Sequence, residues 1–175
     1  ECMTRAPQLV VDNRNLVKKV VFPLEILPWS TLVVAGFHFV IGLVLIALAV
    51  LVRSGGLPAS ALALPMIVAP LALLALGVVY ACAALGVYLR DLAQVVGFLA
   101  LTLLFLSPVF YPPSAVPEDW RFVIALNPIA TFIEMTRGAL LYGTWPGWRA
   151  LGMIWALGHA FAWLGCHEFQ RTRRG

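Results

Sequence analysis

The chain has 175 residues, of which 62% are apolar and only 11% are charged. A soluble domain carries about 45–50% apolar and about 25% charged residues, so this composition excludes an ordinary soluble enzyme and predicts a protein whose solvent is a lipid bilayer. The net charge is +4, and because the basic residues are spread along the chain, they indicate membrane orientation and give no reason to expect nucleic-acid binding.

The N-terminal part has a pattern of its own over residues 12–28. The chain begins without an initiator Met or a signal-peptide pattern, and we expect it to start partway into a longer protein. Leu16, Val20 and Leu24 recur at helical spacing, and two prolines punctuate the segment. This spacing predicts a short amphipathic helix on the cytoplasmic side. The alternative is a juxtamembrane helix anchored by lipid phosphates.

Long apolar stretches follow, separated by charged residues. Since a spanning helix needs roughly 20 apolar residues, we expect spans at 30–52, 65–89, 93–110 and 148–169, followed by a basic cytoplasmic tail at 170–175. Pro70 suits the first turn of the second of these, where its missing N–H is no loss. Small residues four apart, such as Gly77 with Ala81, favour close approach of helices.

The stretch 111–147 differs from the spans. Its apolar pieces, 122–133 and 138–148, are too short to cross a bilayer and are typical of re-entrant or interfacial segments. The basic segments at the two ends of the chain share the cytoplasmic side only if 111–147 enters the membrane and returns to the outer face. We therefore predict an all-α integral membrane protein, a polytopic helical bundle of about four spans with an external re-entrant helical hairpin.

Residues that could carry chemistry are few. The sequence has no P-loop, no H-E-x-x-H, no G-x-S-x-G and no acidic pair inside a span, so we expect neither an enzyme nor a cofactor or metal site. His38 and His159 are the histidines that lie well inside the expected spans, away from their ends. Neither has an obvious acidic partner at similar depth, which favours a neutral imidazole bonded to a neighbouring helix for His38. Glu134 and Arg137 either pair on one helix face or both face water.

Three stretches resemble one known family. They are Asn15 to Pro28, Tyr88 to Leu92, and Ser107 to Pro112 with Val116-Pro117, Asn127-Pro128 and Arg137. In order, they are similar to the cytoplasmic segment before the third span, the turn between the fourth and fifth spans, and the external re-entrant hairpin of the membrane subunits of type-2 ABC exporters. The resemblance is to the branch that exports bacterial O-antigen, teichoic acid and capsule, and it covers nearly the whole chain.

The resemblance implies a permease in the bacterial inner membrane that has six spans when complete. The chain would then be a fragment that lacks the N-terminal spans and is unstable alone. Two copies would form a channel for a lipid-linked or free cell-surface polysaccharide. Each copy would dock an ATP-binding subunit from the cytoplasm, and ATP hydrolysis would belong to that partner.

The resemblance also implies roles for particular residues. Coupling to the ATP-binding subunit is implied for Lys18, Lys19, Phe22, Pro23, Leu24, Glu25, Arg90 and Asp91. The external gate would comprise Pro108, Phe110, Tyr111, Pro112, Pro117, Asn127, Pro128, Glu134 and Arg137. Phe122, Phe132 and Tyr142 are candidate channel aromatics along which sugars could slide, the alternative being that they are aromatics of the membrane interface.

Three other interpretations stay open. A drug or lipid exporter of the same superfamily would share the fold. An ion-coupled secondary transporter would work without an ATPase and would depend on His38 or His159. A membrane enzyme acting on lipid-linked sugars would need a carboxylate or metal site near the interface, for which Glu118-Asp119 is the only candidate, and these residues suit helix capping better.

Overall fold

The computed structural model describes residues 1–12, 26–89, 91–111 and 115–173. Every regular element in these ranges is helical, which confirms the all-α fold class. The elements in chain order are α1 (Cys2–Arg5), η1 (Ala6–Gln8), α2 (Leu9–Asp12), α4 (Ile26–Ser54), η2 (Ala59–Ala63), α5 (Leu64–Gly86), α6 (Leu92–Leu106), α7 (Glu118–Leu126), α8 (Pro128–Arg137), η4 (Gly138–Tyr142) and α9 (Trp148–Arg173).

Two stretches of the described chain are long and apolar enough to cross a membrane by length and composition. They are Ile26–Ser54 and Ala59–Gly86, while Leu92–Leu106 is a shorter apolar helix. The 26 residues of α9 include tryptophan, histidine and glycine residues among the aliphatic ones. The total of four spans stays a prediction.

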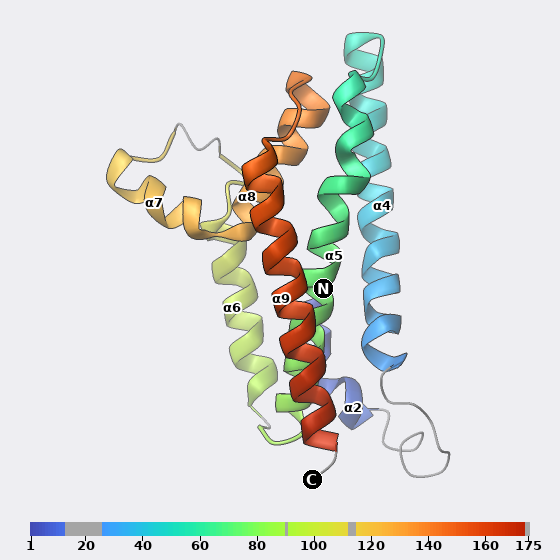
Figure 1. Cartoon of the computed structure of the whole chain (residues 1–175), viewed down its shortest axis with the longest axis vertical. Helices are drawn as coiled ribbons and strands as arrows, with labels where there is room; N and C mark the ends of the chain where they lie inside the picture. The colour runs from blue at the N-terminus through green and yellow to red at the C-terminus, as the bar shows by residue number, and fades with distance from the viewer. Residues whose placement is uncertain (13–25, 90, 112–114, 174–175) are drawn as a thin grey trace.

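The helices form an elongated bundle (Figure 1). The α4–α5 and α8–α9 connections lie at its upper end, and α2, the α5–α6 turn and the C-terminus lie at its lower end (Figure 1). α6 rises from the lower end, α7 projects sideways from the upper half, and α9 descends beside α5 (Figure 1). The chain between α6 and α9 thus begins and ends in the same half of the bundle, as a re-entrant segment would.

Glycine allows α5 and α9 to pack with their backbones in contact. A Cβ on Gly77 would come within 2.2 Å of the Phe161 carbonyl oxygen, and one on Gly165 within 2.2 Å of the Gly77 oxygen. Gly158 approaches Pro70 in the same way, at 2.6 Å. Since any side chain would separate the two helices, glycine is required at this crossing, and the predicted close approach at Gly77 is confirmed.

Two buried clusters hold the bundle together. The upper one joins η2, α5, α8, η4 and α9 through Ala63, Ile67, Phe132, Ala139, Leu151 and Ile154. The lower one joins α5 to the end of α9, with the Tyr80 and Phe169 rings 5.3 Å apart and edge to face. The upper cluster therefore supports the segment predicted to be an external hairpin.

Prolines set element boundaries that the sequence pattern misplaced. The expectation that Pro70 lies in a first helical turn is wrong, because Pro65 occupies that place and Pro70 lies inside α5. α6 ends at Leu106, before the limit of 110, because Pro108 favours the extended conformation of Ser107 (φ −89°, ψ 141°). The apolar piece 122–133 is broken by extended Asn127 before Pro128.

Candidate functional site

A group of polar contacts joins the end of α6 to the start of α8. Asn127 Nδ2 donates to Ser107 Oγ over 3.0 Å, and both residues are buried. The Asn127 side chain also caps α8, because its Oδ1 accepts from the Ile129 N–H at 3.0 Å. One buried amide therefore fixes both where α8 begins and how it sits on α6.

Arg137 makes a second bond between the same two regions. Its Nη2 donates to the Pro108 carbonyl over 2.9 Å, and its Nη1 donates to Glu134 Oε1. Of the two alternatives for Glu134 and Arg137, the structure has the ion pair. We call these contacts (Ser107, Pro108, Asn127, Glu134 and Arg137) the hairpin clasp. It brings together four predicted gate residues and adds Ser107, which lay in the quoted motif but was not itself a predicted site residue.

The segment after α8 is a single turn of π-helix, η4, and it ends at Gly143, whose φ of +67° suits glycine. Ser60 is buried and its hydroxyl donates to the Ala139 carbonyl over 2.7 Å, which ties η2 to η4. Beside this turn lies an open pocket of about 470 Å³ whose lining includes Thr131, Glu134 and Trp145. The pocket offers an aromatic ring beside hydroxyl and carboxylate groups.

The remaining predicted gate residues lie around the clasp. Pro108 is buried and Pro128 starts α8, while Phe110 and Pro117 are exposed. The Tyr111 hydroxyl donates to the Phe105 carbonyl over 3.0 Å, which holds the chain leaving α6 against that helix. Pro112 lies outside the described residues.

The predicted channel aromatics divide into two groups. Phe122 and Tyr142 are 67% and 70% exposed. Phe132 is only 7% exposed and belongs to the upper buried cluster, where its ring lies 6.2 Å from that of Phe39. A channel-lining role for Phe132 is therefore not supported, because its side chain is packed between helices.

The predicted coupling residues fall mostly outside the described residues. Lys18, Lys19, Phe22, Pro23, Leu24, Glu25 and Arg90 lie there. Asp91 is described and exposed, and it precedes α6 at the lower end of the bundle, the end that also holds α2 and the C-terminus (Figure 1).

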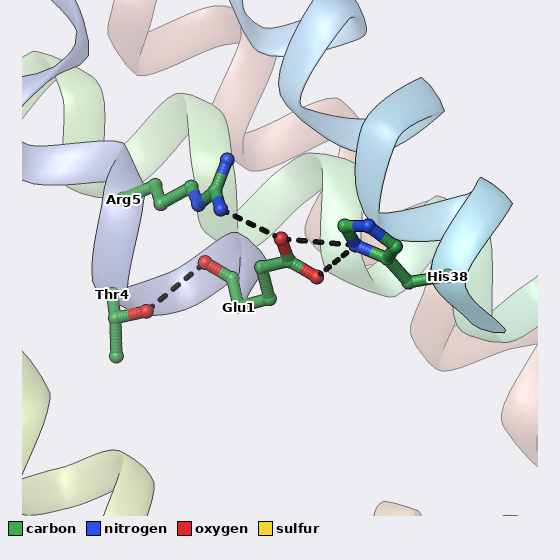
Figure 2. A network of polar contacts seen from close by, with 4 residues as sticks. All are labelled: Glu1, Thr4, Arg5 and His38. Atoms are coloured by element: carbon green, nitrogen blue, oxygen red, sulfur yellow. Dashed lines mark hydrogen bonds and ion pairs between the residues drawn. The ribbon is translucent and has the colours of Figure 1, made fainter. Parts of the chain in front are cut away.

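A charged network that the sequence analysis missed lies on α1 and α4. His38 Nδ1 is 2.9 Å from Glu1 Oε2, and Arg5 Nη2 is 2.9 Å from Glu1 Oε1 (Figure 2). The expectation that His38 lacks an acidic partner is wrong. Residues 1 and 38 are far apart in sequence, and only the packing of α1 beside α4 brings them together.

The other histidines make local contacts. His159 Nδ1 lies 2.9 Å from the Trp155 carbonyl one turn earlier, and its ring stacks on Trp155 with centroids 5.5 Å apart. His167 is 3.8 Å from Glu168. Across the described ranges, no group of three or more His, Cys, Asp or Glu residues is arranged to hold a metal ion.

Comparison with known proteins gives one family and three relatives. The ABC-2 type transporter family matches residues 1–141. One O-antigen export system permease protein RfbA of Klebsiella pneumoniae is 26% identical to this chain over 136 residues, which are 77% of this chain and 52% of the relative. A second RfbA of Klebsiella pneumoniae is 23% identical to it over 165 residues, which are 93% of this chain and 63% of the relative. An O-antigen export system permease protein RfbA of Myxococcus xanthus is 28% identical over 167 residues (94% and 64%). The chain thus spans between half and two thirds of the length of these relatives.

Proposed function

Because the chain belongs to the ABC-2 type transporter family, we propose that it is the membrane-spanning permease part of an ATP-driven exporter of a cell-surface polysaccharide of the O-antigen class. The complete protein would reside in the bacterial inner membrane. It would work as two copies, each docked to a cytoplasmic ATP-binding subunit. The cargo would be a lipid-linked or free glycan.

The observation that carries the proposal is the similarity to O-antigen export permeases over 77% to 94% of the chain. Drug and lipid exporters of the same superfamily would share the helical architecture, so the fold alone does not separate them. The three relatives are named for one kind of cargo, which favours a glycan over a drug. An ion-coupled carrier is disfavoured because the family match is to ABC transporters.

The hairpin clasp supports a gating role for the upper end of the bundle. Two sets of contacts, from Asn127 and from Arg137, join α8 to the single short segment Ser107–Pro108. Hydrogen bonds of this kind are worth about 1 kcal/mol each for neutral groups and about 1.5–3 kcal/mol for charged ones. They are strong enough to define a closed state and weak enough to break during a transport cycle.

The pocket beside Trp145 supports contact with a sugar. A pyranose ring has an apolar face that packs on an aromatic ring and hydroxyl groups that bond to polar side chains, and the pocket presents both kinds of surface. Phe122 and Tyr142 are further exposed rings of the same hairpin region. Weak and repeated contacts of this sort suit a long polymer that must leave as readily as it enters.

Loss of the gene in the parent organism tests the cargo. Deletion is expected to remove the glycan from the cell surface while lipid-linked glycan accumulates inside, and the intact gene is expected to restore display. Unchanged surface polysaccharide in the deletion strain would overturn the proposal. Accumulation of a hydrophobic drug, with normal glycan display, would indicate a drug exporter.

Co-purification tests the partner. The complete protein is expected to bring down an ATP-binding subunit, and the charge-reversed variant Lys18→Glu/Lys19→Glu/Glu25→Lys is expected to lose it. Arg53→Glu is the matched control, because Arg53 lies at the opposite end of α4 from the coupling segment. Recovery of no ATPase with the unaltered protein would contradict the ABC assignment. Equal loss in both variants would show that charge reversal harms the whole protein.

A further inference from the structure

Glu134 belongs both to the hairpin clasp and to the pocket beside η4. In the clasp its Oε1 accepts a hydrogen bond from Arg137 Nη1, and the same residue lines the pocket of about 470 Å³. All the lining residues of that pocket lie between positions 124 and 150, so one continuous stretch of chain builds it. The clasp and the pocket therefore share a carboxylate.

The two members of the Glu134–Arg137 ion pair line different pockets. Thr131, Glu134 and Gly138 recur at helical spacing and line the pocket beside η4. Arg137 lines a second pocket of about 420 Å³, whose other walls include Phe39 of α4. The ion pair thus crosses from the pocket that holds hydroxyl groups and an aromatic ring to one that reaches α4.

The Glu134 carboxylate has acceptor capacity beyond this ion pair. Its side chain is 38% exposed, and within the described ranges the only hydrogen bond to the carboxylate is the one from Arg137 to Oε1. An ionised carboxylate offers about four acceptor positions on its two oxygens. Two neighbouring hydroxyl groups of a sugar ring are spaced to donate to both oxygens, and hydrogen bonds to an ionised group are about twice as strong as neutral ones.

Arg137 has fewer alternatives than Glu134. Its side chain is only 20% exposed, and among the residues that the structure describes Glu134 is its only ionic partner. A part-buried charge that loses its partner is destabilised, and the remaining bond to the Pro108 carbonyl does not neutralise the guanidinium. Loss of the Glu134 contact therefore favours an arrangement in which Arg137 leaves Pro108 for water.

We propose that Glu134 alternates between the clasp and the cargo: a sugar unit in the pocket binds its carboxylate, Arg137 loses its counterion, and the clasp opens. This coupling rests on the proposed transport function and gives one residue the role of linking cargo binding to the gate. Because the coupling of two binding events is reciprocal, an opened clasp also holds the sugar more tightly.

Glycan binding to the complete transporter tests one direction of the coupling. The probe is the water-soluble glycan released by mild acid from the surface polysaccharide of the parent organism. It is titrated onto the permease with its ATP-binding partner in lipid nanodiscs, and binding is followed by tryptophan fluorescence. Arg137→Ala frees Glu134, so the affinity is expected to rise about fivefold or more, within the usual range of coupling factors.

Two further variants identify the carboxylate responsible. Glu134→Gln is expected to bind the glycan about tenfold more weakly than the unaltered protein, which corresponds to the loss of one hydrogen bond to a charged group. Asp119→Asn is the matched control, because Asp119 is an exposed carboxylate on α7 and is absent from the pocket lining. Its affinity for the glycan is expected to equal that of the unaltered protein.

Dye leakage tests the other direction. Saturating glycan is expected to raise the leakage of a small polar dye several-fold from proteoliposomes that hold the unaltered transporter. With Glu134→Gln the same glycan should leave the leakage unchanged, because the sugar no longer competes with Arg137 for a carboxylate.

Three results would overturn the coupling. Equal glycan affinity of Arg137→Ala and the unaltered protein would show that the clasp does not compete for Glu134, and binding by neither would remove the glycan from the pocket. A glycan-induced leak that persists in Glu134→Gln would place the coupling elsewhere. Arg137→Gln replaces Arg137→Ala if the latter fails to fold.

Surface glycan display in the deletion strain is scored separately from these measurements. If deletion removes the display but the affinity changes are absent, the coupling is wrong and the transport function stands. If deletion leaves the display unchanged, the transport function itself is wrong.

Discussion

Asn127 of the α8 cap and Ser107 at the end of α6 are joined by a buried hydrogen bond of 3.0 Å, although they are 20 residues apart in sequence. Asn127 uses its other amide atom to cap α8. The same residue therefore specifies a local feature, the helix start, and a tertiary one, the attachment of the hairpin to the bundle.

A double-mutant cycle on this pair should show coupling. Ser107→Ala leaves the buried Asn127 amide without its partner, which is expected to destabilise the protein by about 1–3 kcal/mol. Asn127→Ala also removes the cap, for a further loss of about 0.5–2 kcal/mol. The double variant should lose less than the sum, because the shared bond can be lost only once. Thermal unfolding of the complete protein in detergent measures each value.

Ser54→Ala is the control for that cycle. Ser54 is exposed and bonds only to nearby carbonyl groups, those of Val50 and Gly56, so its replacement should change stability by less than about 0.5 kcal/mol. If the stability losses of Ser107→Ala and Asn127→Ala simply add in the double variant, the two side chains do not stabilise the protein through a shared hydrogen bond.

The contribution of Arg137 to the clasp should depend more on the planar shape of its guanidinium group than on its positive charge. Arg137→Lys keeps the positive charge, but one ammonium cannot reproduce the two-directional bonding of the guanidinium to Pro108 and Glu134. With the clasp weakened, the ratio of closed to open states should fall roughly tenfold or more, given about 1.5–3 kcal/mol for a charged hydrogen bond. Leakage of a small polar dye from proteoliposomes that hold the complete transporter measures this.

Glu134→Gln separates the two halves of the Arg137 arrangement. It removes the ion pair but leaves the bond from Arg137 to the Pro108 carbonyl, so its leak should be smaller than that of Arg137→Ala. If Arg137→Ala leaks no more than the unaltered protein, the clasp does not hold the pathway closed.

The α5–α9 crossing gives a prediction that is independent of function. Gly165→Ala places a Cβ within 2.2 Å of the Gly77 carbonyl oxygen, and overpacking of this kind costs roughly 1–3 kcal/mol. Gly152→Ala on the same helix meets no atom within 4 Å, and alanine is the better helix former by about 1 kcal/mol. The melting temperature in detergent should fall for the first variant and stay level or rise for the second. A similar fall in both would contradict the contact.

Periodicity and charge placement predicted much of this architecture, because both are local properties of the chain. The expected ranges 30–52 and 148–169 lie inside α4 and α9, and the paired geometry of Glu134 with Arg137 follows from their i, i+3 spacing. Asn127-Pro128 was recognised as a motif, but its effect on the helix was not. The apolar pattern runs through it, whereas the restriction that proline places on Asn127 divides it into α7 and α8.

Three contacts that sequence reasoning missed join residues far apart in the sequence. Glu1 meets His38, Ser60 meets Ala139, and Ser107 meets Asn127, and in each case the partner is chosen by how helices pack. For Phe132, sequence reasoning predicted a role that the packing of the helices does not support. Its aromatic character suits a channel wall, but its position on α8 turns it into the buried cluster. One signal for Glu1 was available, since a carboxylate beside apolar helices requires a partner.

Trp145 and Trp148 offer a matched test of the proposed sugar contact. Both are exposed and near the start of α9, but Trp145 lines the pocket beside η4 and Trp148 is absent from its lining. If both only anchor the protein at the membrane interface, Trp145→Ala and Trp148→Ala should have equal and small effects. If the Trp145 ring contacts the sugar during export, Trp145→Ala alone should slow export, and Trp145→Phe should restore most of the rate because it keeps an aromatic face.

Since one aromatic contact is worth about 0.5–1.5 kcal/mol, the expected loss of export rate is several-fold. The rate is measured as the appearance of new glycan on the cell surface at equal permease abundance. Equal rates for Trp145→Ala and Trp148→Ala would remove the pocket from the export pathway.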